Sequence, residues 1–96
     1  MAIYYLRVIL HSKPNSHPDY TKLHDELDKK GFKRKIQDDK SGEWYHLPHA
    51  EYVRTSVLTL DEVHNQARKI ADVIDTDNAV LIAKSSTVMW TGLDPV

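Results

Sequence analysis

The stretch IYYLRVILHSKPNSHPDYTKLHDELDKKGF, residues 3–32, decides the fold, because it passes from a strand through a loop into a helix that ends at a glycine. Its first part, residues 3–11, is aromatic and β-branched, which is typical of a strand. Alternate positions of this strand form a wholly apolar face, made of Tyr4, Leu6, Val8 and Leu10. We expect this face to meet the helices. The opposite side carries Ile3, Tyr5, Arg7, Ile9 and His11.

The first helix is predicted over residues 18–30. Pro18 suits a first helical position, and Leu23 and Leu27 recur at helical spacing. Gly31 follows two lysines, as a C-terminal cap would.

A hairpin follows the first helix. Residues 32–37 read as a strand, the turn formers of residues 38–42 connect it to a third strand, and that strand is predicted over residues 43–54. Pro48 lies within the third strand and removes one ladder donor, so we expect this strand at an edge of the sheet or bulged at Pro48.

A second helix and a further strand complete the pattern. Thr59 and Glu62 form a capping box, and apolar residues then recur at spacings of three and four. Residues 78–84 read as a fourth strand, and residues 85–93 as a turn and a short fifth strand that holds Val88 and Trp90. The sequence leaves open whether this last segment pairs with its own sheet or with that of another subunit.

The order strand, helix, hairpin, helix, strand predicts a single α+β domain over residues 1–96. Right-handed crossovers place both helices on one face of an antiparallel sheet, which gives a ferredoxin-like β-α-β-β-α-β sandwich with a possible short fifth strand. The opposite face stays open and carries aromatic and aliphatic side chains. Such a face favours self-association or ligand stacking.

Composition excludes several classes of protein. With 13 basic and 14 acidic side chains, the formal charge of -1 excludes a polybasic protein that binds nucleic acid by net charge alone. No cysteine is present, so disulfides, thiolate zinc sites and cysteine nucleophiles are excluded. We find no signal-peptide pattern and no apolar run of about 18 residues, and therefore expect a cytoplasmic protein without a membrane segment and without a cofactor.

A basic cluster stands where the first helix meets the second strand. Its members are Lys29, Lys30, Lys33, Arg34 and Lys35, and Arg7 is expected nearby. One interpretation is a footprint for nucleic acid, with Tyr5, Trp44, Tyr45 or Tyr52 available to stack on bases. The other is that these lysines complement the helix dipole and are solvated.

Three histidines are candidates for chemistry. His46 and His49 lie three positions apart, which places them on opposite faces of a regular strand. A bulge at Pro48 could bring both to one face, but the sequence offers no carboxylate partner, so a metal site is not expected. His11 ends the first strand, where it acts either as a general base near neutral pH or as a solvated residue at the sheet edge.

Five short runs resemble the bacterial GhoS family. They are LRVILH (6–11), DYTKLH (19–24), KGFKR (30–34), LPHAEY (47–52) and WTGL (90–93). The resemblance implies a ferredoxin-like fold similar to the small CRISPR-associated endoribonuclease-like proteins, and an antitoxin that cleaves the messenger RNA of a membrane-lytic toxin. Metal-dependent relatives in the CRISPR-associated group carry an aspartate where His11 stands here. The resemblance therefore favours metal-independent cleavage, with His11 as base and Arg7 or Arg34 stabilising the transition state.

Two functions follow as hypotheses. The first is a homodimeric RNA-binding protein, with or without endoribonuclease activity, in a toxin-antitoxin system. Its predicted RNA-binding residues are Tyr5, Lys30, Lys33, Lys35, Trp44 and Tyr45, and its predicted catalytic residues are Arg7, His11 and Arg34. The second is a protein-interaction module that docks a partner or a second copy through the open sheet face and the strand containing Pro48.

Overall fold

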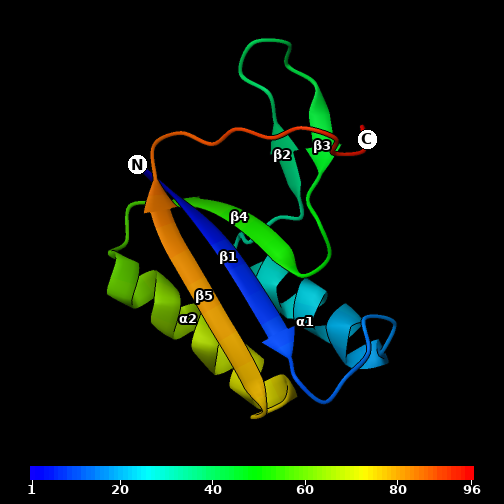
Figure 1. Ribbon diagram of the computed structural model, residues 1–96. Helices are drawn as coiled ribbons and strands as arrows, with labels where there is room; N and C mark the ends of the chain where they lie inside the picture. The colour runs from blue at the N-terminus through cyan, green and yellow to red at the C-terminus, as the bar shows by residue number, and fades with distance from the viewer.

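The fold was analysed in a computed structural model that describes all of residues 1–96 and contains two helices and five strands (Figure 1). The elements in chain order are β1 (Ala2–Leu10), α1 (Pro18–Lys29), β2 (Lys35–Gln37), β3 (Trp44–His46), β4 (Glu51–Ser56), α2 (Leu60–Ile74) and β5 (Asn78–Ser85). Neither helix combines the length and the apolar character needed to cross a bilayer.

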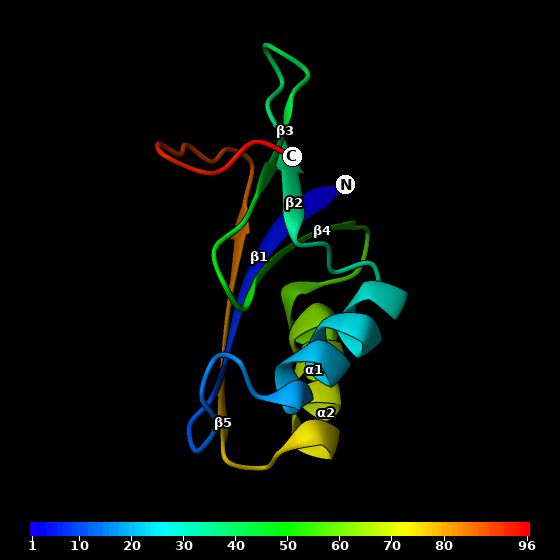
Figure 2. The ribbon, with the colours of Figure 1, turned by 90° about the vertical axis from the view of Figure 1, so that its right-hand side faces the viewer.

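β1 is the central strand of a three-stranded antiparallel sheet in the order β4-β1-β5. Tyr5 marks the register, since it lies opposite Val53 on one side and Ala83 on the other. Both helices cover the same face of this sheet (Figure 2). The ferredoxin-like layout predicted from the element order is therefore confirmed.

β2 and β3 form a separate hairpin that extends beyond the end of the three-stranded sheet (Figure 1). A single bridge between Lys33 and Val53 connects the residues before β2 to β4. The prediction of one continuous strand over residues 43–54 is wrong, because residues 47–50 make a turn between β3 and β4. Pro48 has no N–H to donate, and Ala50 takes a left-handed conformation with φ of 60°.

The C-terminal segment after β5, residues 86–96, forms no regular strand, so the predicted strand at Val88 and Trp90 is wrong. The segment passes over the face opposite the helices and returns to β3 of its own chain (Figure 2). There the His46 N–H donates to the Asp94 carbonyl at 2.9 Å, and the Val96 N–H donates to the Trp44 carbonyl at 3.0 Å. The backbone bonds that hold it are thus internal to one chain.

The core lies between the sheet and the helices, as the alternation along β1 predicted. Its buried residues are Tyr4, Leu6, Val8, Leu10, Tyr20, Leu23, Leu27, Phe32, Ala50, Tyr52, Val63, Ala67 and Ala71. Two hydroxyl groups tie this core to the backbone. The Tyr4 hydroxyl donates to the Leu58 carbonyl at 2.7 Å, and the Tyr20 hydroxyl accepts from the Leu10 N–H at 3.0 Å.

The capping box at the start of α2 forms as predicted. The Thr59 hydroxyl accepts from the Glu62 N–H at 3.2 Å, and the Glu62 side chain accepts from the Thr59 N–H at 3.4 Å. Two backbone donors that the helix itself leaves unpaired are thereby satisfied.

Thr59→Ala should lower the free energy of unfolding by about 1 kcal/mol, because the Glu62 N–H loses its acceptor. Urea denaturation followed by circular dichroism measures this change. Thr76→Ala, at an exposed threonine outside any helix or strand, is the control and should leave the midpoint unchanged. Equal midpoints for both variants would contradict the role of the cap.

Candidate nucleic-acid interface

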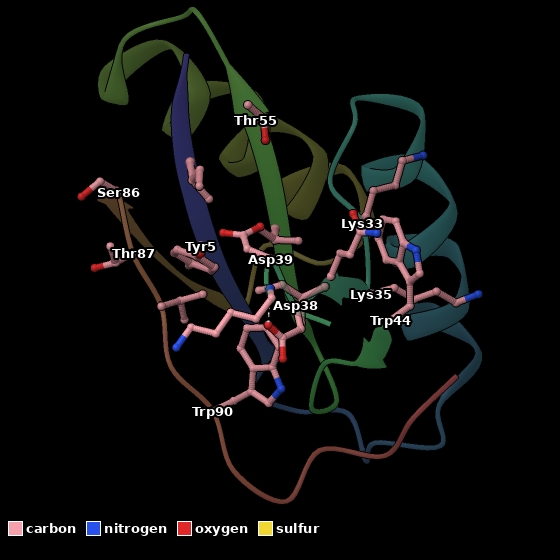
Figure 3. A pocket seen from close by; sticks show the side chains of 16 residues that line it. Tyr5, Lys33, Lys35, Asp38, Asp39, Trp44, Thr55, Ser86, Thr87 and Trp90 are labelled. Atoms are coloured by element: carbon pink, nitrogen blue, oxygen red, sulfur yellow. Dashed lines mark hydrogen bonds between the residues drawn. The ribbon is translucent and has the colours of Figure 1, made fainter. Parts of the chain in front are cut away.

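The open face of the sheet carries a hollow of about 440 Å³, which we call the sheet hollow. Its floor is formed by Ile3 and Tyr5 of β1 and by Val53 and Thr55 of β4. The β2–β3 hairpin and the C-terminal segment form its walls, so that three parts of the chain meet around Tyr5 (Figure 3). Residues of the walls include Lys33, Lys35, Asp38, Asp39, Lys40, Trp44, Ser86, Thr87 and Trp90.

A second hollow of about 770 Å³, the helix hollow, lies between α1 and the hairpin. It is lined by His24, Asp25, Asp28, Phe32, Lys33, Arg34, Lys35, Trp44, His46 and Leu47. Lys33, Lys35 and Trp44 line both hollows, and therefore form a ridge between them. A chain-like ligand that occupies one hollow can continue across this ridge into the other.

The charges around the hollows are mixed. Each hollow taken alone has one more cation than carboxylates, because Lys33 and Lys35 line both, whereas the two hollows together hold equal numbers of each. Lys33 is paired with Asp28 at 2.8 Å, whereas Arg34 and Lys35 form no ion pair. Lys35 is exposed and is therefore free to bind an anion. These cations give the two hollows local attraction for phosphate in a chain whose net charge is close to zero.

Aromatic rings lie on the ridge and in the sheet hollow. Trp44 is 49% exposed, and Tyr5 is half-buried on the floor of the sheet hollow. Trp90 packs on Tyr45 with the ring centroids 5.7 Å apart and is held at the edge of the hollow. Burial raises the pKa of Tyr5, and the Asp39 carboxylate raises it further, so the phenol stays protonated at neutral pH. Tyr5 and Trp44 thus offer two surfaces for stacking.

A cluster of four aromatic side chains, Tyr20, His24, His49 and Tyr52, lies beside the helix hollow. His24 Nδ1 and the Tyr52 hydroxyl share a hydrogen bond, and the His49 ring meets Tyr20 edge-on at 4.5 Å. Burial is the main reason why the pKa of His24 falls to about 4, with the Arg34 charge adding to the effect. The pKa of His49 is lowered by the same two causes, and its buried Nε2 has no hydrogen-bond partner. Both rings are therefore neutral at pH 7.

Four of the six predicted RNA-binding residues meet at the sheet hollow, namely Tyr5, Lys33, Lys35 and Trp44. The other two line neither hollow. Lys30 caps the end of α1, and the Tyr45 hydroxyl donates to Glu43 at 3.1 Å while its ring covers Trp90.

Lys40 and Trp90 also line the sheet hollow and were missed as site residues. Both reach it through loops, whose path no short-range sequence pattern predicts. The sequence shows only that a lysine lies in the predicted turn and a tryptophan near the C-terminus.

The three predicted catalytic residues are not brought together. The His11 N–H bonds Asp77 at the end of β1 beside the start of β5, Arg7 lies opposite Glu51 on the open face, and Arg34 lines the helix hollow. The histidines that do share a hollow with Arg34 are His24 and His46. No group of three or more histidine, aspartate or glutamate side chains is arranged to hold a metal ion.

Comparisons with known proteins add no assignment to this geometry: no protein family, curated protein or solved structure matches the chain. The resemblance to the GhoS family remains a hypothesis drawn from short sequence runs. The two hollows are therefore the features of the chain that bear on its function.

The half-buried His24 and His49 predict a stability that falls with acidification. The pKa of His24 is lower in the folded chain, at about 4, than the ordinary value of 6.5, so the unfolded chain binds more protons between these values. Stability should be complete above pH 6.5 and decline as the pH falls toward 4, and the lowered pKa of His49 acts in the same direction.

Thermal unfolding at pH 7, 6 and 5 measures this dependence. His24→Gln should flatten the dependence of the melting temperature on pH, whatever it does to stability at pH 7. His11→Gln, at an exposed histidine, should keep the slope of the unchanged chain. A slope as steep in His24→Gln as in the original chain would show that His24 does not carry the effect, whereas a reduced remainder is expected from His49.

Proposed function

We propose that this protein binds single-stranded RNA across the ridge of Lys33, Lys35 and Trp44. The observation that carries the proposal is that these three side chains line both hollows, so one strand can be held continuously. Cations that follow a backbone and aromatic rings that stack on bases are the usual parts of a single-strand site. The choice of RNA over DNA comes from the resemblance to the GhoS family.

The cations of the hairpin and of the residues before it are directed into different hollows. Lys33 and Lys35 are two positions apart, so their side chains point to the same side of an extended chain. Arg34 points to the other side and lines only the helix hollow. A strand that crosses the ridge would thus meet two lysines in the sheet hollow and an additional arginine in the helix hollow.

Cleavage of the bound RNA is an extension of this proposal rather than its basis. Metal-independent cleavage needs a base for the 2'-hydroxyl and a cation beside the phosphate. His24, neutral at pH 7, and His46 are the imidazoles that share the helix hollow with Arg34. Incubation of the labelled RNA with EDTA tests this extension, and a loss of cleavage in His46→Ala but not in His11→Ala would locate it.

RNA affinity should fall as salt rises, and fall less steeply when the ridge loses its lysines. For a labelled single-stranded RNA, Lys33→Ala with Lys35→Ala should reduce the slope of log K against log salt by about 0.7 for each phosphate contact removed. Fluorescence anisotropy at several salt concentrations measures this slope. Lys69→Ala, at an exposed lysine of α2, is the control. Absence of binding at low salt, or an unchanged slope in the double variant, would refute the RNA-binding proposal.

A second candidate function is association with a second copy of the chain through β5. This strand pairs with β1 on one side and has no partner along its other edge. In a twofold antiparallel pair centred on Leu81, Leu81 meets its own copy and Lys84 meets Asn78, so no like charges face each other. The Leu81 side chain is 69% exposed in the single chain and would contact its copy in such a pair.

Leu81→Lys should convert this dimer to a monomer, because the twofold pairing would place two lysines opposite each other. Light scattering at tens of micromolar measures the mass against the 11.1 kDa of one chain. Val57→Lys, at a valine that is 81% exposed and follows β4 rather than standing on β5, should leave the mass unchanged. A mass of one chain for the protein without substitutions would exclude the β5 dimer.

A further inference from the structure

Two carboxylates stand in the sheet hollow, where a site for phosphate alone would have none. Asp38 is explained by the hairpin turn, since its side chain accepts from the Lys40 N–H at 2.9 Å and its carbonyl accepts from the Gly42 N–H at 2.8 Å. Asp39 is different. Its carboxylate makes no hydrogen bond and no ion pair, although it lies in the same turn.

The position of Asp39 relates it to the floor of the hollow. Figure 3 shows the Asp39 side chain beside Tyr5, although the two residues come from different elements. Its charge is felt at the Tyr5 hydroxyl, where it adds to the rise in the pKa of that phenol. A flat ligand stacked on Tyr5 would therefore present one edge to a free carboxylate.

The surroundings favour an anionic ligand that carries hydrogen-bond donors. The three lysines of the hollow outnumber its two carboxylates, and this balance disfavours a cationic ligand such as an arginine side chain. The volume of about 440 Å³ lies within the usual range for small ligands, about 300–1,000 Å³. A nucleotide meets both requirements, because its phosphate suits the lysines and its base can face the carboxylate.

The carboxylate discriminates among the bases, because it accepts hydrogen bonds and donates none. Guanine offers two adjacent donors on its Watson–Crick edge, the N1 imino and the N2 amino group. Adenine and cytosine offer an amino group next to a ring nitrogen that accepts, and uracil offers one imino group between two carbonyls. Guanine alone can pair with both oxygens of a carboxylate.

We infer that the sheet hollow is a guanine site, in which Tyr5 stacks on the base and Asp39 accepts from its N1–H and N2–H groups. The inference rests on the proposed binding of single-stranded RNA and names the nucleotide that this part of the site selects. Lys35 and Lys40 are the cations placed to hold the neighbouring phosphates.

The test compares oligouridine RNA strands that carry one central guanosine, inosine, adenosine or cytidine, in anisotropy titrations at a fixed low salt concentration. Inosine lacks the N2 amino group alone and is the sharpest comparison. The guanosine strand should bind at least about fivefold more tightly than each of the other three, since a bidentate base contact supports discrimination of this order.

Two variants of the same turn separate charge from recognition. Asp39→Asn should abolish the preference for guanosine, because one carboxylate oxygen becomes an amide donor, while binding of plain oligouridine is kept or strengthened. Asp38→Asn removes an equal charge, and its side-chain carbonyl can still accept from the Lys40 N–H. This control should retain the preference.

The outcomes distinguish the inference from the proposed function. Equal affinity for all four strands would overturn the guanine site and leave RNA binding intact, as would a preference that persists in Asp39→Asn. Failure of every strand to bind would refute RNA binding itself.

Discussion

The alternation of side chains along β1 is the constraint on which the whole molecule depends. β1 is paired on both sides, so its backbone has no freedom to slide without breaking two ladders. In this register Tyr4 and Leu6 enter the core, and Tyr5 lies on the open face. A slip of one residue would exchange the two sets, with Tyr5 directed into the core and the buried side chains into solvent. The same register that stabilises the fold therefore also places the floor of the candidate site.

The sheet hollow arises where three segments that are distant in sequence meet, whereas the helix hollow lies between α1 and the hairpin that follows it. The hairpin extends past the end of the sheet, and the C-terminal segment runs back across the open face to join it. Neither has a large core of its own, so the shape of the sheet hollow depends on backbone hydrogen bonds and a few ring contacts. Such construction suits a binding surface, because side chains such as Lys35 and Trp44 remain available rather than packed.

Local physical rules predicted most of the fold and part of the site. The apolar face of β1, the proline at the start of α1 and the capping box at Thr59 each depend on near neighbours, and each was found as expected. The turn at residues 47–50 was missed, because an alanine, Ala50, takes the left-handed conformation there and the sequence has no glycine to indicate it. The place of Trp90 was missed because long-range bonds to β3 decide it. For the same reason His24 and His46 could not be grouped from spacing alone, since α1 and β3 meet through tertiary packing.

The attachment of the C-terminal segment has a consequence for motion. Between Val88 and Val96, the bonds that tie it to the rest of the backbone are the amides of His46 and Val96. One wall of the sheet hollow can therefore detach without disturbing the core, as a small unit that opens well below the free energy of global unfolding. The amide protons of these two residues should then exchange with deuterated solvent together and early, long before those of β1. Amide exchange would thus report how often the hollow stands open to a ligand too large to enter from the side.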